Sequence, residues 1–159
     1  MWILRWPVAL ILLILVVGSV FPAIAVTVVH TDLVDLSGVS ADLESLAQNT
    51  TWLEAGLWYG AALLFLVAAI RLMRRTQAFW AWLIGFALYG ARWALTQNSQ
   101  DGGLVATVQS LSVEAFQPEN LTATAPATQV GLVVFHLAVG LLIFIIDAAD
   151  RHYWDKQGA

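Results

Sequence analysis

Cysteine is absent from the 159-residue chain. Without a thiol the protein has no disulfide relay, no cysteine nucleophile, no iron–sulfur ligand and no thiolate zinc site. Any chemistry that the protein performs must therefore use its other side chains.

Charge is scarce as well. Charged residues make up 11% of the chain, hydrophobic residues make up 60%, and the formal net charge is −4. A soluble globule of this size needs more polar surface than this composition supplies. The acidic balance also argues against nucleic acid as a partner, because nucleic-acid-binding proteins present a basic face. The composition predicts an integral membrane protein whose main surroundings are the lipid bilayer.

Long apolar runs set the expected fold. A membrane-crossing helix needs about 20 mostly apolar residues, whereas a membrane β-strand shows about ten residues of alternating character. Four continuous runs meet the first description, at roughly residues 8–29, 53–73, 78–95 and 130–149. We predict an all-α fold in which residues 1–159 form a single domain, an up-down bundle of four transmembrane helices.

The segments around these spans give further local predictions. Residues 30–52 and 96–129 form the long connections, and apolar residues recur at helical spacing in 40–48 and 104–116. This spacing is typical of short amphipathic helices that lie on a membrane surface. The sequence Thr51-Trp52-Leu53-Glu54 matches a capping box and predicts that Thr51 caps the second span.

Cationic residues are distributed unevenly between the two ends of the predicted bundle. With four crossings, six of the seven fall on one side, namely Arg5, Arg71, Arg74, Arg75, Arg151 and Lys156. By the positive-inside rule this side faces the cytoplasm, or the matrix or stroma of an organelle. We expect an inner-membrane protein, bacterial or organellar, with both termini cytoplasmic.

The last span carries a stripe of unusual residues. His136, Gly140, Ile143 and Asp147 are spaced by four, three and four residues, so one helix face presents them all. Charges within hydrocarbon are costly and are expected to pair across helices. Their depths in the predicted bundle match in two pairs. We expect an outer pair of Arg92 with His136 and an inner pair of Arg71 with Asp147.

Small residues recur at the spacings that let membrane helices approach closely. The second span opens with a Gly-x-x-x-Gly pair, and the third and fourth spans carry small residues on the faces of their polar groups. The predicted helix-packing positions are Gly56, Gly60, Ala81, Gly85 and Gly140.

His136 is the candidate cofactor ligand. A neutral imidazole can bind haem iron or the magnesium of a chlorophyll-type pigment, and Gly140 one turn later would leave room for a flat macrocycle. A bis-histidine haem needs a second ligand at the same depth, and neither His30 nor His152 provides one. The alternative is a histidine that hydrogen-bonds to a neighbouring helix.

Motifs for catalysis are missing. The chain has no His-x-x-x-His pair, no nucleophile elbow and no phosphate loop, so we predict neither an enzyme nor a metal site. We expect a non-catalytic accessory or structural subunit of a larger membrane complex, of a bioenergetic kind, with other membrane subunits as its partners. The alternatives are a pigment- or haem-binding subunit that uses His136, and a small transporter or channel component.

Overall fold

The computed structural model describes residues 2–31, 51–98 and 126–157. Every regular element in these ranges is a helix, as predicted. The helices are α1 (Trp2–His30), α3 (Trp52–Met73), α4 (Phe79–Asn98) and α6 (Pro126–Gln157). The short helices expected within 40–48 and 104–116 lie outside the described residues.

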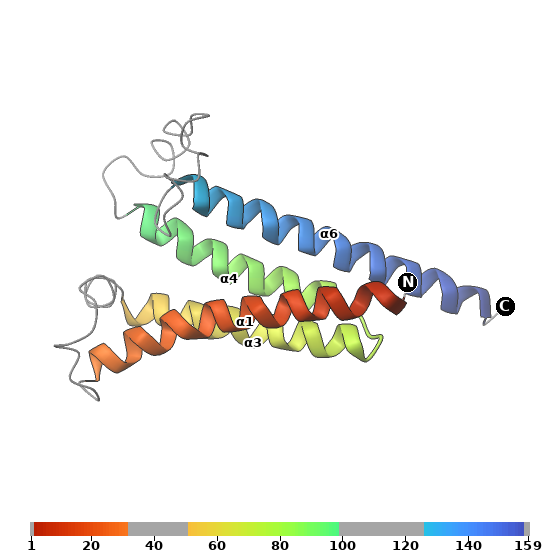
Figure 1. Ribbon diagram of the computed structural model, residues 1–159, viewed down its shortest axis with the longest axis horizontal. Helices are drawn as coiled ribbons and strands as arrows, with labels where there is room; N and C mark the ends of the chain where they lie inside the picture. Colours follow the sequence, from red (N-terminus) through yellow and green to blue (C-terminus); the bar gives the residue numbers. More distant parts are fainter. Residues whose placement is uncertain (1, 32–50, 99–125, 158–159) are drawn as a thin grey trace.

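The four helices run up and down along the long axis of the molecule (Figure 1). The start of α1, the end of α6 and the short turn between α3 and α4 lie at one end, which we call the turn end. The last residues of α1 and the first residues of α3 and α6 lie at the other, which we call the opposite end. This order matches the up-down arrangement predicted from the spacing of the apolar runs.

The start of α3 and the extents of α1 and α6 can be compared with the sequence. The Thr51 hydroxyl accepts a hydrogen bond of 3.3 Å from the Glu54 amide, which confirms the predicted cap of α3. α1 runs through Pro22 as one helix. α6 continues beyond the predicted span, and its later residues Arg151 and His152 are exposed.

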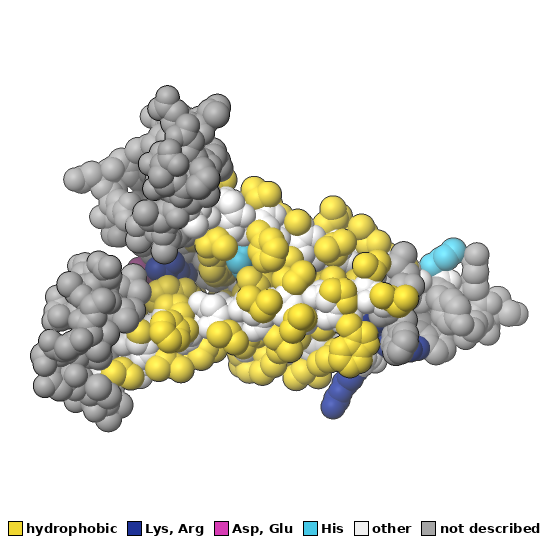
Figure 2. All heavy atoms as spheres, in the orientation of Figure 1, with side chains coloured by type: hydrophobic (Ala, Val, Ile, Leu, Met, Phe, Trp, Pro, Cys, Tyr) yellow, Lys and Arg dark blue, Asp and Glu magenta, His cyan; other side chains and the backbone are white. Residues whose placement is uncertain are grey.

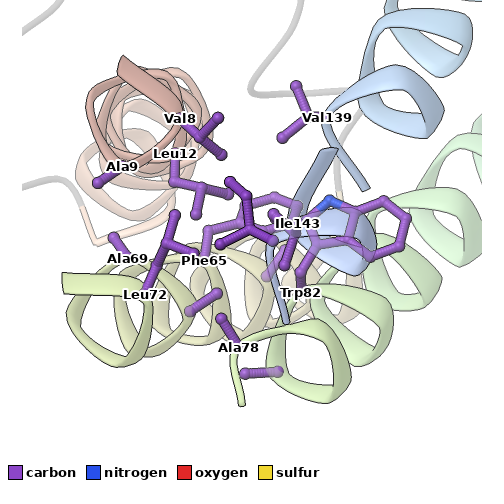
Figure 3. Close-up of a cluster of buried hydrophobic side chains, with 14 residues drawn as sticks. Val8, Ala9, Leu12, Phe65, Ala69, Leu72, Ala78, Trp82, Val139 and Ile143 are labelled. Atoms are coloured by element: carbon purple, nitrogen blue, oxygen red, sulfur yellow. The ribbon is translucent and has the colours of Figure 1, made fainter. Parts of the chain in front are cut away.

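One apolar core joins all four helices. α1 contributes Val8, Ala9 and Leu12, α3 contributes residues around Phe65 and Leu72, α4 contributes Trp82, and α6 contributes Val139, Ile143 and Ile146. Figure 3 shows these side chains converging between the helices. The contact is most extensive between α1 and α3 and between α3 and α4, whereas α6 touches α4 and α1 over a smaller area. α6 is therefore the least tightly packed of the four.

The outward faces of the bundle are apolar (Figure 2). On α1 alone Trp6, Leu10, Ile14 and Phe21 are each at least 60% exposed. Such a surface is compatible with contact to lipid tails and is rare on a soluble monomer. It suggests an integral membrane protein.

Three of the helices are long and apolar enough to cross a membrane, over Ile3–Val28, Trp52–Met73 and Val130–His152. α4 is not among them, although we predicted a span over residues 78–95. Its 20 residues include Arg92 and the polar end Thr96-Gln97-Asn98, and they are rich in amphipathic rings. The length and composition of the helices thus support three crossings, and the fourth stays a prediction.

Candidate functional site

His136 lies in the interior of the bundle, with 2% of its surface exposed. Its Nδ1 atom is 2.7 Å from the carbonyl oxygen of Leu132, one helical turn earlier on α6. Because a carbonyl can only accept, Nδ1 carries the hydrogen and donates it. In the neutral ring Nε2 then holds a lone pair, which is the form of histidine that binds a metal ion.

Aromatic rings from three helices surround this imidazole. Tyr89 of α4 stacks on it with ring centroids 4.5 Å apart and an interplanar angle of 22°, and Phe86 stacks at 5.8 Å. Phe65 of α3 lies at 5.7 Å, and Phe135 of α6 meets the ring edge-on at 6.3 Å. The imidazole is therefore packed as one ring in an aromatic cluster.

The space beside Gly140 is also filled. A Cβ atom at this position would overlap the six-membered ring of Trp82, which lies directly against the glycine. Trp82 in turn stacks on Phe86 at 5.4 Å with an interplanar angle of 6°. The room that a macrocycle would need next to Gly140 is thus occupied by an indole of α4.

Arg92 shares this half of the bundle with His136. Its guanidinium carbon lies 4.1 Å from the centre of the Trp58 ring, a cation–π contact. Glu54 and Tyr89 are close enough to interact with it electrostatically. The predicted outer residues therefore share one layer, in which Tyr89 interacts with both Arg92 and His136.

Asp147 has a partner that the sequence did not indicate. One of its carboxylate oxygens accepts hydrogen bonds from the backbone amides of Ala78 and Phe79, at 2.8 and 2.9 Å. These amides open α4, so a carboxylate of α6 caps another helix and also meets the positive end of its dipole. The predicted pair of Arg71 and Asp147 is not formed. The Arg71 side chain is exposed and donates to the Gln77 carbonyl at 3.4 Å.

Arg5 forms the ion pair of this end instead. Its guanidinium binds the carboxylate of Asp150 and also donates to the Leu72 carbonyl of α3 at 3.1 Å. The distribution of cations in the sequence predicts only on which side of the membrane Arg5 lies and gives it no partner. The sequence does contain a signal for this partner. Asp150 follows Asp147 by three residues, so both aspartates lie on the same face of the helix.

The predicted packing residues separate into two groups. Gly60 and Gly85 lie between α3 and α4, where an added Cβ atom would come within 2.9 Å of Leu88 and 3.1 Å of Phe65, respectively. Ala81 is buried in the core. Gly56 has no atom within 4 Å of an added Cβ, so this half of the Gly-x-x-x-Gly pair makes no helix contact within the described bundle.

The described residues include no cluster of three or more histidine, aspartate or glutamate side chains that could hold a metal ion. Comparison of the chain with protein-family models, with curated proteins and with solved structures finds no match. The functional reading consequently depends on the chemistry of these side chains alone.

Proposed function

We propose that the chain is a four-span integral membrane protein that serves as a non-catalytic structural subunit of a larger membrane complex. The observation that carries this proposal is that its buried charged side chains connect one helix to another. Arg5 of α1 binds Asp150 of α6, and Asp147 of α6 binds amides at the start of α4, while the outward faces remain apolar. Polar chemistry here serves to hold helices together. The bioenergetic character of the complex stays a prediction from the sequence.

The path of the chain supports a fourth crossing. α3 ends at the turn end, whereas α6 begins at the opposite end (Figure 1). If α1, α3 and α6 cross a bilayer, the chain must return across it between residues 73 and 126, and α4 runs in that direction. The lower hydropathy of α4 is compatible with this path, because its Arg92 lies against Trp58 and near Glu54 within the bundle.

The orientation can be tested cleanly because the chain has no cysteine. Gln77 in the turn and Thr31 after α1 are both exposed and are suited to single-cysteine variants. By the positive-inside rule, a membrane-impermeant maleimide added to intact cells should label Thr31→Cys and leave Gln77→Cys unlabelled. The opposite pattern would reverse the proposed orientation, and equal labelling would contradict four crossings.

The subunit role is tested by native mass. Extraction in a mild detergent should give an assembly heavier than the 17.3 kDa chain, with a fixed stoichiometry of other membrane proteins. A chain that runs alone and retains a measurable activity would overturn the proposal.

A pigment- or haem-binding subunit is the second candidate, and one observation favours it. The Leu132 carbonyl fixes the hydrogen on Nδ1 of His136, which leaves Nε2 as a competent ligand. The indole of Trp82 beside Gly140 opposes it, because a macrocycle there would require that ring to move. A visible absorption band in the native complex that disappears in His136→Phe would establish this role, and a colourless complex would exclude it.

A further inference from the structure

The turn between α3 and α4 places an arginine where glycine is the usual residue. The Thr76 amide donates to the Arg71 carbonyl at 3.0 Å, and the Arg75 amide donates to the Leu72 carbonyl at 3.3 Å. These two bonds form a Schellman motif, in which the residue after the helix cap is left-handed and is most often glycine. Arg75 holds that place with a φ of 58°.

This backbone conformation is disfavoured for a residue with a Cβ atom. Among the described residues other than glycine, Arg75 is the one with a positive φ. Its amide would make the same hydrogen bond if the residue were glycine. The side chain is exposed, so core packing does not explain its presence. The position therefore points to a use for the guanidinium itself.

The neighbouring charges strengthen this reading. Arg71 and Arg74 are exposed beside Arg75, and Figure 2 shows basic side chains projecting from this end. The nearby carboxylates of α6 are already used, since Asp150 binds Arg5 and Asp147 binds two amides. Within the described part of the chain, the three arginines of the turn form no ion pair. They present an uncompensated positive surface.

Two tryptophans indicate the depth of this surface in a bilayer. Trp80, five residues after Arg75, and Trp6, on α1 next to Arg5, are each 60% exposed. Indole rings concentrate at the headgroup boundary of a membrane. The turn should then lie at the level of lipid phosphates.

We propose that the basic turn, defined by Arg71, Arg74 and Arg75, binds the phosphate of an anionic lipid headgroup. A guanidinium can donate two parallel hydrogen bonds to a phosphate, which a compact ammonium cannot match. Anionic lipid would also supply the negative partner that the three arginines do not find among the described side chains. The proposal depends on the proposed membrane location, because the ligand is part of the bilayer.

Native mass spectrometry of the full chain in detergent provides the test. The protein is exposed to phosphatidylglycerol and phosphatidylcholine with identical acyl chains, and the ratio of retained lipids is measured. The double variant Arg74→Gln/Arg75→Gly should lower this ratio at least about fivefold, since it removes two guanidinium groups that donate directly to the phosphate. Arg151→Gln is the matched control, because it removes an exposed cation from α6 without touching the turn; its ratio should change less than twofold.

Arg75→Gly alone should lower the lipid preference, by less than the double variant does, while its melting temperature stays equal or rises, because glycine relieves the left-handed conformation. A clear fall in melting temperature would overturn the argument that the arginine serves no folding role. Equal retention of both lipids by the wild type would overturn the proposal, and so would an equal loss in Arg151→Gln. Displacement of the lipid by millimolar inorganic phosphate would show that the ligand is a soluble anion.

Vesicle flotation separates this inference from the membrane location. A chain that fails to enter neutral phosphatidylcholine vesicles contradicts both proposals. A chain that enters them and shows no preference for phosphatidylglycerol contradicts the lipid site alone.

Discussion

The two ends of the bundle handle buried polar groups in different ways. At the turn end each buried charge binds another helix: Arg5 joins α1 to Asp150 of α6 and to the end of α3, and Asp147 joins α6 to the start of α4. Toward the opposite end the Nδ1 of His136 in α6 binds its own helix, whereas Arg92 of α4 lies over the Trp58 ring of α3 and interacts with Glu54.

This contrast explains how α6 is held. α6 shares less contact with its neighbours than α3 shares with α1 and α4, yet Asp150 binds Arg5 of α1 and Asp147 binds the start of α4 at the turn end. Directional bonds fix register and position at that end. Aromatic packing around His136 fills space without specifying one partner atom. The contacts of α6 should therefore be sensitive to substitution at the turn end and tolerant around His136.

The largest effect is expected from Asp147→Ala. This change leaves the buried amide of Ala78 and that of Phe79 without their acceptor and removes a negative charge from the start of α4. Loss of two charge-assisted hydrogen bonds should lower the free energy of unfolding by about 3 kcal/mol. Reversible unfolding in mixed micelles measures this change in the free energy of unfolding. Asp147→Asn retains one acceptor oxygen and should lose less than half as much; equal losses in both variants would show that the cap is not the cause.

A smaller loss is expected where α6 meets α4 in the middle of the bundle. In Gly140→Ala the added methyl group overlaps the Trp82 ring, so an indole that is stacked on Phe86 must move. Overpacking of this kind should lower the free energy of unfolding by about 2 kcal/mol. Adding Trp82→Leu to this variant should restore part of the lost stability, and a double-mutant cycle measures how much.

Gly56→Ala is the matched control for this prediction. The same methyl group meets no atom within 4 Å there, and alanine is the better helix former. The variant should be neutral or slightly more stable than the wild type. A loss comparable to that of Gly140→Ala would mean that Gly56 contacts another chain in the sample.

Sequence reasoning succeeded where one pattern determines the outcome. Apolar run length gave the four helices, and the Thr51 cap was read from four consecutive residues. The prediction that His136 and Asp147 face the interior of the bundle is also confirmed, because both side chains are buried. Spacing within a helix gives the face that a residue occupies, and that rule needs no knowledge of the other helices.

The partners of those residues were harder to predict. The sequence suggested a guanidinium for Asp147, but backbone amides at the start of α4 lie nearer, and any chain segment can supply amides. The sequence likewise predicted open space beside Gly140, whereas the Trp82 ring occupies it. Such contacts depend on helix rotation and on the path of the turn, which the periodicity of one helix does not encode.

The smallest destabilisation is expected from His136→Phe, in the tolerant part of α6. The phenyl ring is flat and aromatic like the imidazole, although one ring atom larger, and it enters a cluster that already contains Phe65, Phe86 and Tyr89. The Leu132 carbonyl loses one donor but remains within the hydrogen-bonded backbone of α6. The free energy of unfolding should change by less than about 1 kcal/mol.

Denaturant unfolding of His136→Phe beside His136→Ala sharpens this expectation. Alanine leaves a cavity among the aromatic rings and should cost about 2–3 kcal/mol more than phenylalanine. If phenylalanine costs as much as alanine, then Nε2 has a partner that a phenyl ring cannot replace. His136 would in that case bind another helix or a ligand directionally, and the contrast between the two ends of the bundle would disappear.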